Sequence, residues 1–256
     1  MARRLNGERL MLLAWSRAIL LQMAHPLVAV GIDEHSSFRA RPWSAASRLH
    51  HTVRAMLALT FADQAGRAQA LDGIRRIHRR INGTLPAAAG IYAAGTRYSA
   101  EDPALVLWVH ATLLESIPLV YDQLVAPLAD ADRDAYCAEA AGTAIELGAR
   151  PGEVPRTWQA ARTHLDNGYR SGGIVVTDAA RRMARMVLAP ALSQVVLPLR
   201  SINRTLTVGL LPAPIREQYG FTWTPRDERA FGRTVRGIRT LRRHLPERVA
   251  LWPEAR

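Results

Sequence analysis

Helical periodicity runs through most of this chain, and it is the feature that most limits the possible folds. In residues 71–83, apolar side chains recur every three or four positions, at Leu71, Ile74, Ile77 and Ile81. This spacing predicts a helix with one apolar face, and Gly83 marks its expected C-terminal end. No stretch shows the alternation and hairpin turns that are typical of strands. The sequence therefore predicts an all-α fold.

The same periodicity predicts further helices along the chain. We expect them over residues 7–24, 26–30, 44–61, 64–82, 103–118, 130–147, 155–170, 178–189, 191–207 and 225–245. A polar turn is expected over residues 31–38 and a loop over residues 84–98. These segments predict one globular helical domain of about nine to eleven helices, which occupies residues 1–246 and is followed by a loose tail over residues 247–256.

Short local signals support several of these helix boundaries. Asp63 and Thr224 are both expected to cap the helices that follow them, and Pro225 stands at the first helical position after Thr224. Residues 99–102 have the form of a capping box. Pro118 is expected to kink or end its helix, because proline removes one backbone hydrogen bond.

The composition of the chain excludes some classes of protein. All 34 basic residues among the 256 are arginine, and the formal net charge is +12. The arginines are spread along every predicted helix without a recognisable nucleic-acid motif, so we expect no nucleic-acid partner. Peripheral contact with a membrane surface stays an alternative. With Cys137 as the sole cysteine, the chain has neither a disulfide framework nor a thiolate metal cluster, and we expect a reducing compartment.

An apolar segment near the N-terminus bears on localisation. Residues 10–32 are apolar enough to suggest a signal peptide or a membrane span, but Arg17, Gln22, His25 and Pro26 interrupt them. We interpret this segment as a buried first helix and expect a cytoplasmic protein, with membrane association as one alternative and export as another.

Several histidines lie on apolar faces of the predicted helices. His78 follows Ile74 by four residues, and His110 occupies the same kind of position on its own helix. An inward imidazole is most often a hydrogen-bonded core residue, but it is also the commonest metal ligand among protein side chains. Arg48, His51 and Thr52 share one helix face, which could cover one side of a cofactor.

Other kinds of catalytic site are missing from the sequence. There is no glycine-rich phosphate loop, no nucleophile elbow and no glutamate followed by histidine three residues later. What remains is a set of inward histidines in an arginine-rich helical chain, which suits a noncovalently bound haem. Arginines can pair with the haem propionates in bidentate fashion.

Several sequence blocks together resemble one family of oxygenases. They are Gln22-Met23-Ala24-His25-Pro26, Arg48 to Thr52, Ile77-His78 to Gly83, Trp108-Val109-His110-Ala111-Thr112-Leu113, and Arg216-Glu217-Gln218-Tyr219-Gly220. The chain is similar from about residue 7 to residue 240 to the family that includes bacterial latex-clearing rubber oxygenases and the fungal MpaB-type oxygenase. The first and fourth of these blocks are specific together, although each alone would be weak.

This resemblance implies a helical fold around a buried haem b and the oxidative cleavage of an isoprenoid carbon–carbon double bond by dioxygen. His78 matches the proximal iron ligand, and Arg48 and Thr52 match catalytic residues on the distal side. The catalytic carboxylate matches Asp33 or Glu34. Departing from the family, His51 stands where rubber oxygenases carry a lysine, and it is a candidate distal ligand. The remaining candidates for cofactor contact are His25, His35 and His110.

The sequence thus leaves three functions open. The first is a haem-dependent oxygenase that acts with dioxygen on a hydrophobic, alkene-bearing small molecule. The second is a non-catalytic haem protein for electron transfer or sensing, with iron held by two histidines. The third is a basic helical protein that binds a membrane or nucleic acid without a cofactor.

Overall fold

Helices make up nearly all of the regular structure, as the periodicity predicts. The computed structural model describes residues 1–35, 42–188 and 197–256. Within α4 and α10, it describes the side chains from residue 51 and from residue 201 onward. Within these residues the helices are α1 (Ala2–Asn6), α2 (Met11–Met23), α3 (Pro26–His35), α4 (Pro42–Phe61), α5 (Gln64–His78), α6 (Pro103–Leu124), α7 (Asp130–Glu146), α8 (Trp158–Arg170), α9 (Asp178–Leu188), α10 (Leu197–Gly209), α11 (Ala213–Gln218), α12 (Pro225–His244) and α13 (Glu247–Ala250). The described part of the chain therefore carries thirteen helices, slightly more than expected, and three of them are six residues or shorter.

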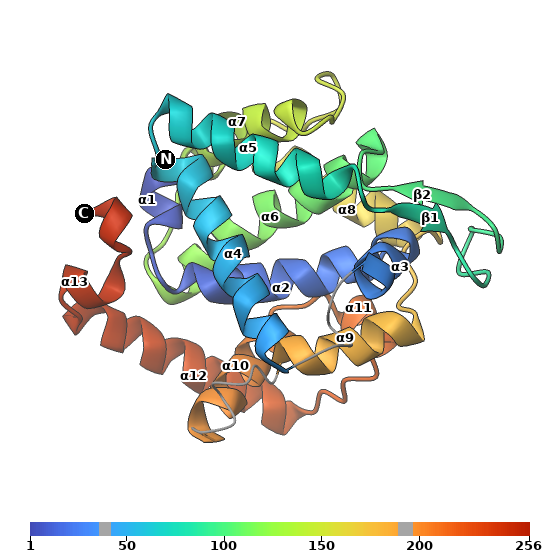
Figure 1. Cartoon of the computed structure of the whole chain (residues 1–256). Helices are drawn as coiled ribbons and strands as arrows, with labels where there is room; N and C mark the ends of the chain where they lie inside the picture. Colours follow the sequence, from blue (N-terminus) through green and yellow to red (C-terminus); the bar gives the residue numbers. More distant parts are fainter. Residues whose placement is uncertain (36–41, 189–196) are drawn as a thin grey trace.

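Two apolar helices form the centre of the molecule. α2 packs along α6, and the other helices surround this pair (Figure 1). α6 also packs against α7, α8 and α12, which explains why it is apolar on nearly all sides. The core on one side of the pair includes Leu20, Leu21 and Met183, and the core on the other side includes Leu114 and Ile117.

One charged network lies inside this core. The guanidinium group of Arg17 in α2 forms a buried ion pair with Glu115 of α6. It also donates to the hydroxyl of Ser116 over 2.5 Å and to the backbone carbonyl of Leu210 over 2.7 Å. These bonds satisfy a charge that interrupts an otherwise apolar helix, and they tie α2 to α6 and to the end of α10.

The segment after α2 is more helical than we expected. His25 and Pro26 do separate two helices, as predicted, but α3 continues beyond Val30 to His35. The prediction of a polar turn from residue 31 was therefore wrong over residues 31–35, and residues 36–41 lie outside the described part. Glycine at position 31 is tolerated within α3 because Ile81 and Tyr98 pack directly against it.

A short β-hairpin replaces the expected end of the α5 helix. α5 ends at His78, and Asn82–Thr84 forms strand β1, which pairs antiparallel with strand β2 over Arg97–Ser99. Gly83 is thus a strand residue and not a helix terminator, which corrects the prediction. A Cβ atom at position 83 would lie 2.7 Å from the Tyr98 hydroxyl, so the close packing of Tyr98 explains the glycine.

The capping signals were correct at two of three helices. Asp63 accepts a hydrogen bond from the Gly66 amide, and Thr224 forms a complete capping box with Asp227. Before α6, however, Asp102 itself is the N-cap, so the predicted box that begins at Ser99 is wrong. Pro118 does not end α6, because burial against neighbouring helices compensates for the single hydrogen bond that proline removes.

Residues 247–256 pack back onto the N-terminal segment. They form α13 and a 3-10 turn over Pro253–Ala255, where a loose tail was expected. The Trp252 amide donates to the Gly7 carbonyl, and the Arg9 amide donates to the Ala250 carbonyl, both over 2.9 Å. These bonds hold the two ends of the chain side by side (Figure 1).

One helix of the described residues has the length and apolar composition to cross a membrane. This helix is α6, and 72% of its most apolar window is buried inside the protein. α2 and α3 reach the same composition only as a pair, and they are bent by 106° relative to one another.

Candidate functional site

A cavity of about 630 Å³ lies between α4 and α5. Small residues of the two helices, including Ala55, Ala58 and Gly73, leave this space open, and Ile74 and Ile77 give it an apolar wall. Its other lining residues include His51 and three arginines, Arg54, Arg76 and Arg80. The cavity therefore combines an apolar surface with one imidazole and several positive charges, which suits a flat apolar ligand that carries anionic groups.

His78 lies at the C-terminal end of α5, one turn beyond Ile74. It is half-buried and does not lie in the core, because Leu71 is the sole buried residue of α5 and Ile77 is 60% exposed. Burial lowers the pKa of the His78 imidazole, although the negative charge of Glu101 opposes this shift. The ring is thus mainly neutral at pH 7, which is the form that binds metal ions.

The expectation that His78 points inward on an apolar helix face is therefore corrected. The apolar stripe of α5 is only partly buried, and Arg75 reaches across to α7, where it donates two hydrogen bonds to the backbone carbonyl of Glu146. The His78 backbone carbonyl accepts a hydrogen bond from the Ile81 amide, but the imidazole makes no hydrogen bond with any described residue. His78 is not one of the residues that line the α4–α5 cavity.

The predicted distal residues lie on α4, which is the main neighbour of α5. His51 and Thr52 are both exposed, and His51 lines the cavity opposite Ile77 and its neighbours. The side chain of Arg48 lies outside the described residues, so its predicted place beside Thr52 stays a prediction. The structure thus brings His51 and the apolar stripe of α5 together at one cavity.

The two candidate carboxylates have different partners. Asp33 lies 3.1 Å from the guanidinium group of Arg182 in α9, and its side chain is 13% exposed. Glu34 is exposed and accepts a hydrogen bond of 2.6 Å from the hydroxyl of Tyr98. Glu34 is therefore the better placed of the two for proton transfer, since Asp33 forms an ion pair between two helices.

Tyr98 was missed by the sequence analysis. Its ring is buried between α3 and the hairpin, and its hydroxyl lies 3.3 Å from Nε2 of His35. The same nitrogen lies 3.1 Å from the carbonyl oxygen of Asn82, so it carries the hydrogen. Burial and Glu34 together raise the pKa of the Tyr98 hydroxyl, which keeps it a hydrogen-bond donor to Glu34. The sequence analysis missed Tyr98 because it did not predict the hairpin over residues 82–99.

His25 has an evident structural role. Its Nδ1 accepts a hydrogen bond from the Leu27 amide, so Nε2 carries the hydrogen and bonds to the Tyr92 hydroxyl over 3.1 Å. Burial lowers the pKa of His25 to about 4. Both ring nitrogens are satisfied, which is the ordinary situation of a core histidine.

His110 is also buried, but its ring is not fully satisfied. The residue is 9% exposed, and its Nε2 atom has no hydrogen-bond partner among the described residues. Burial lowers the pKa of His110 to about 4, so the ring is neutral. A buried polar atom without a partner is uncommon in folded proteins and makes His110 a candidate for contact with a bound molecule.

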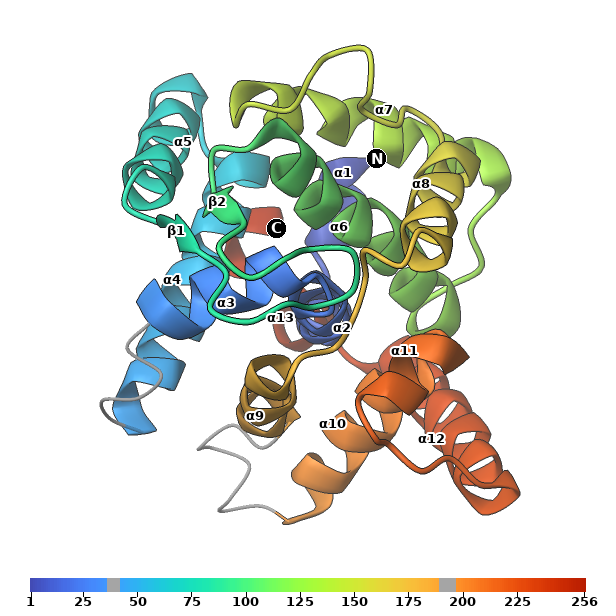
Figure 2. The ribbon, with the colours of Figure 1, turned by 90° about the vertical axis from the view of Figure 1, so that its right-hand side faces the viewer.

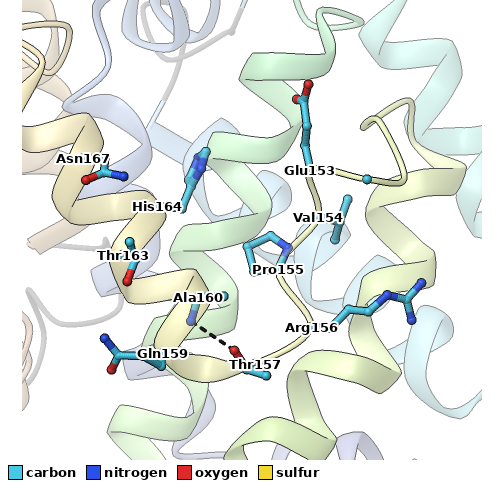
Figure 3. Close-up of a pocket in the computed structure, with 11 residues that line it drawn as sticks. Glu153, Val154, Pro155, Arg156, Thr157, Gln159, Ala160, Thr163, His164 and Asn167 are labelled. Atoms are coloured by element: carbon cyan, nitrogen blue, oxygen red, sulfur yellow. Dashed lines mark hydrogen bonds between the residues drawn. The ribbon is translucent and has the colours of Figure 1, made fainter.

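A second cavity, of about 720 Å³, lies between α8 and the loop that precedes it. Figure 3 shows its polar lining, with Glu153 and His164 on facing segments and Arg156 directed away from them. Burial lowers the pKa of His164, and Glu153 opposes the shift. α8 and α5 lie on opposite sides of α6 (Figure 2), so this cavity contains none of the predicted site residues.

The described side chains do not form a binding site for a bare metal ion. Across the described ranges, no three histidine, cysteine, aspartate or glutamate side chains come together. A haem iron requires a single protein ligand, because the porphyrin supplies the other four in-plane donors.

The fold is thus that of an all-α, single-domain protein with a cavity between two helices and a neutral imidazole at the end of one of them. Comparison with known families gives the identification. Residues 2–240 match the catalytic domain described as ER-bound oxygenase mpaB/B'/Rubber oxygenase, and the chain belongs to this family. The match confirms the family that the sequence blocks suggested and supports a general oxygenase role.

Two curated relatives cover nearly the whole chain. They are the proteins named Uncharacterized protein Mb2261 of Mycobacterium bovis and Uncharacterized protein Rv2237 of Mycobacterium tuberculosis. Each is 24% identical over 242 residues, which cover 91% of this chain and 89% of the relative. No solved structure gives a significant match.

Proposed function

We propose that this protein is a haem b-dependent oxygenase that uses dioxygen on a hydrophobic, alkene-bearing small molecule. The observation that carries the proposal is His78, a neutral, half-buried imidazole with no hydrogen bond to the described residues. It occupies the position that corresponds to the iron ligand in the resemblance, within a chain that belongs to an oxygenase family.

The chemistry of the nearby residues is compatible with haem. Ile74 and Ile77 offer an apolar surface for the porphyrin, and burying exposed Ile77 would be favourable. Arg54, Arg76 and Arg80 at the cavity offer guanidinium groups for the propionates. The Nε2 atom of His110 is also unpartnered, but His110 lines neither of the two cavities, so we do not assign it to this site.

Each residue would then have a distinct role. His78 would hold the iron, and Thr52, with Arg48, would orient dioxygen or substrate on the opposite side. Glu34, held by Tyr98, would accept or return a proton during oxidation of the alkene. Haem, when bound, supplies the activation of dioxygen, and the protein supplies the ligand, the apolar surroundings and the charges.

The main alternative is a haem protein without turnover. His51 lines the cavity together with the apolar wall of α5, so two imidazoles could ligate iron from α4 and α5. Such a site would suit electron transfer or sensing, because the second imidazole would compete with dioxygen for the iron.

Absorption spectroscopy tests the proposed ligand. Purified protein, supplied with haemin, should give a Soret band at about 400–430 nm, and H78A should lose it. H164A is the matched control, since His164 is another half-buried histidine whose pKa is lowered by burial, in the cavity beside α8. A wild-type protein that binds no haem, or an H78A variant with an unchanged spectrum, would contradict the proposal.

A second measurement distinguishes the oxygenase from the alternative. If the protein is an oxygenase, the reduced protein should bind carbon monoxide and consume dioxygen when an isoprenoid alkene is added. If His51 also holds the iron, carbon monoxide should bind only weakly, and H51A should restore this binding. If the wild type and H51A both bind haem but neither consumes dioxygen, the result would favour electron transfer or sensing.

A further inference from the structure

We propose that the outer face of α12 binds the anionic headgroups of a phospholipid membrane. This face carries four exposed arginines, which we call the arginine ladder: Arg229, Arg233, Arg236 and Arg243. Their spacings of four, three and seven residues place them along one side of the helix. None of their guanidinium groups makes a hydrogen bond or ion pair with another described residue, in contrast to Arg242, which pairs with Glu8.

The packing of α12 explains why the ladder faces solvent. Phe231, Val235 and Ile238 lie on the opposite side of the helix and pack against the core beside α6. α12 lies at the periphery of the molecule in both views (Figures 1 and 2). The helix therefore uses its apolar side within the protein and presents its charged side outward.

The charge of this face has no acidic counterpart on the same helix. The two acidic residues of α12 are both in its first turn and both engaged: Asp227 caps the helix through Thr224, and Glu228 accepts a hydrogen bond of 2.7 Å from the Trp223 indole. From Arg229 to Arg243, a length of about 21 Å, the helix carries positive charges only. Neighbouring arginines repel one another, and an anionic surface would relieve this repulsion.

Exposed apolar side chains favour a membrane over nucleic acid as the occupant. Leu241, on the same helix, is 58% exposed, and Val249 of the adjoining α13 is 48% exposed. Leu241 lies about a third of a turn around the helix from the ladder. Arginines bind headgroup phosphates, and exposed apolar side chains at the edge of such a surface can enter the boundary with the acyl chains. Phosphates of nucleic acid would satisfy the arginines but offer no apolar layer for these two residues. The proposal does not depend on haem or on the proposed reaction.

Vesicle sedimentation with the full-length protein tests this proposal. The protein should bind phosphatidylcholine vesicles that contain about 30% phosphatidylserine, bind pure phosphatidylcholine weakly, and lose binding as salt is raised. Changing all four ladder arginines to glutamine should weaken binding to the anionic vesicles by at least about tenfold. The same four changed to lysine should retain most of the binding, because lysine keeps the charge.

A matched control separates the ladder from net charge. Arg150, Arg156, Arg162 and Arg170 are exposed arginines in and before α8, and changing them to glutamine removes the same amount of charge. This control should bind vesicles within about twofold of the wild type. L241S should weaken binding to the anionic vesicles without changing its salt dependence.

Three results would overturn the proposal. The wild type could fail to bind anionic vesicles, or the α8 control could lose as much binding as the ladder variant. The third result is that the wild type binds a short DNA duplex more tightly than it binds vesicles, and that the ladder variant loses this DNA binding. Such a result would identify nucleic acid as the occupant. Thermal unfolding of each variant shows whether the fold is intact, and the lysine variant keeps the test valid if the glutamine variant unfolds.

Discussion

Two buried histidines contribute to how the folded protein responds to acid. Burial lowers the pKa values of His25 and His110 to about 4, whereas in the unfolded chain both should titrate near 6.5. The unfolded state therefore binds more protons than the folded state between about pH 6.5 and pH 4, and stability is lost as the pH falls through this range. Each histidine should contribute a loss of the order of 3 kcal/mol.

Chemical unfolding of the haem-free protein at several pH values measures this effect. In H110L, the decrease in unfolding free energy on acidification should be clearly smaller than in the wild type. H244Q is the control, because His244 is exposed and its replacement should leave the pH dependence unchanged. An H110L variant with the same pH dependence as the wild type would show that His110 is not buried in neutral form.

At the scale of elements, the contact between Gly83 and Tyr98 determines how β1 meets β2. A Cβ atom at position 83 would lie 2.7 Å from the Tyr98 hydroxyl and 3.0 Å from the ring carbon that bears it. G83A should therefore lower the unfolding free energy by about 1–3 kcal/mol. In a Y98F background, the same substitution should cost less, because the closest atom is gone.

A double-mutant cycle by urea unfolding measures the coupling between these positions. G95A provides a contrast, because nothing lies within 4 Å of a Cβ atom at Gly95, although its φ of +82° still disfavours alanine. Y98F should therefore leave the cost of G95A unchanged. Equal costs of G83A in the two backgrounds would indicate that the hydroxyl does not cause the strain.

The elements also show which local signals can be read from sequence. Thr224 and Asp227 form a capping box through bonds between residues three positions apart, so the sequence contained all the information needed. The hairpin was missed because its strands are three residues long and a long loop separates them. Gly83 has a packing role that depends on Tyr98, which is distant in sequence.

Less of the candidate site than of the helix caps could be predicted from the sequence. The proximity of His51 to the apolar stripe of α5 follows from two adjacent helices with a short connection, and a sequence pattern can indicate this. Asp33 and Glu34 have different roles because their partners, Arg182 and Tyr98, lie on different elements. The half-buried position of His78 depends on how loosely α5 packs, and helical periodicity does not indicate that.

At the scale of the whole molecule, a partly buried ion pair joins the N-terminal segment to the end of α12. Glu8 is 3% exposed and accepts two hydrogen bonds from Arg242, of 2.7 and 2.5 Å. Because R242Q would leave a buried carboxylate without its counter-charge, it should lower the unfolding free energy by about 3–5 kcal/mol. Urea unfolding measures the change.

The next residue along the chain provides the control for this prediction. Arg243 is exposed and unpaired among the described residues, so R243Q should change the unfolding free energy by less than about 0.5 kcal/mol. Similar losses in both variants would mean that the positive charge of the helix end matters and the pairing with Glu8 does not.

The contact between the two ends has a topological consequence. Glu8 and Leu251 form a β-bridge, and backbone hydrogen bonds flank it on both sides. A short linker between residues 256 and 1 would make the backbone nearly circular, and new termini could be placed in the exposed turn at residues 150–153. Such a circular permutant should keep the α2–α6 core, the α4–α5 cavity and the hairpin, because none of them requires the chain to begin where it now does.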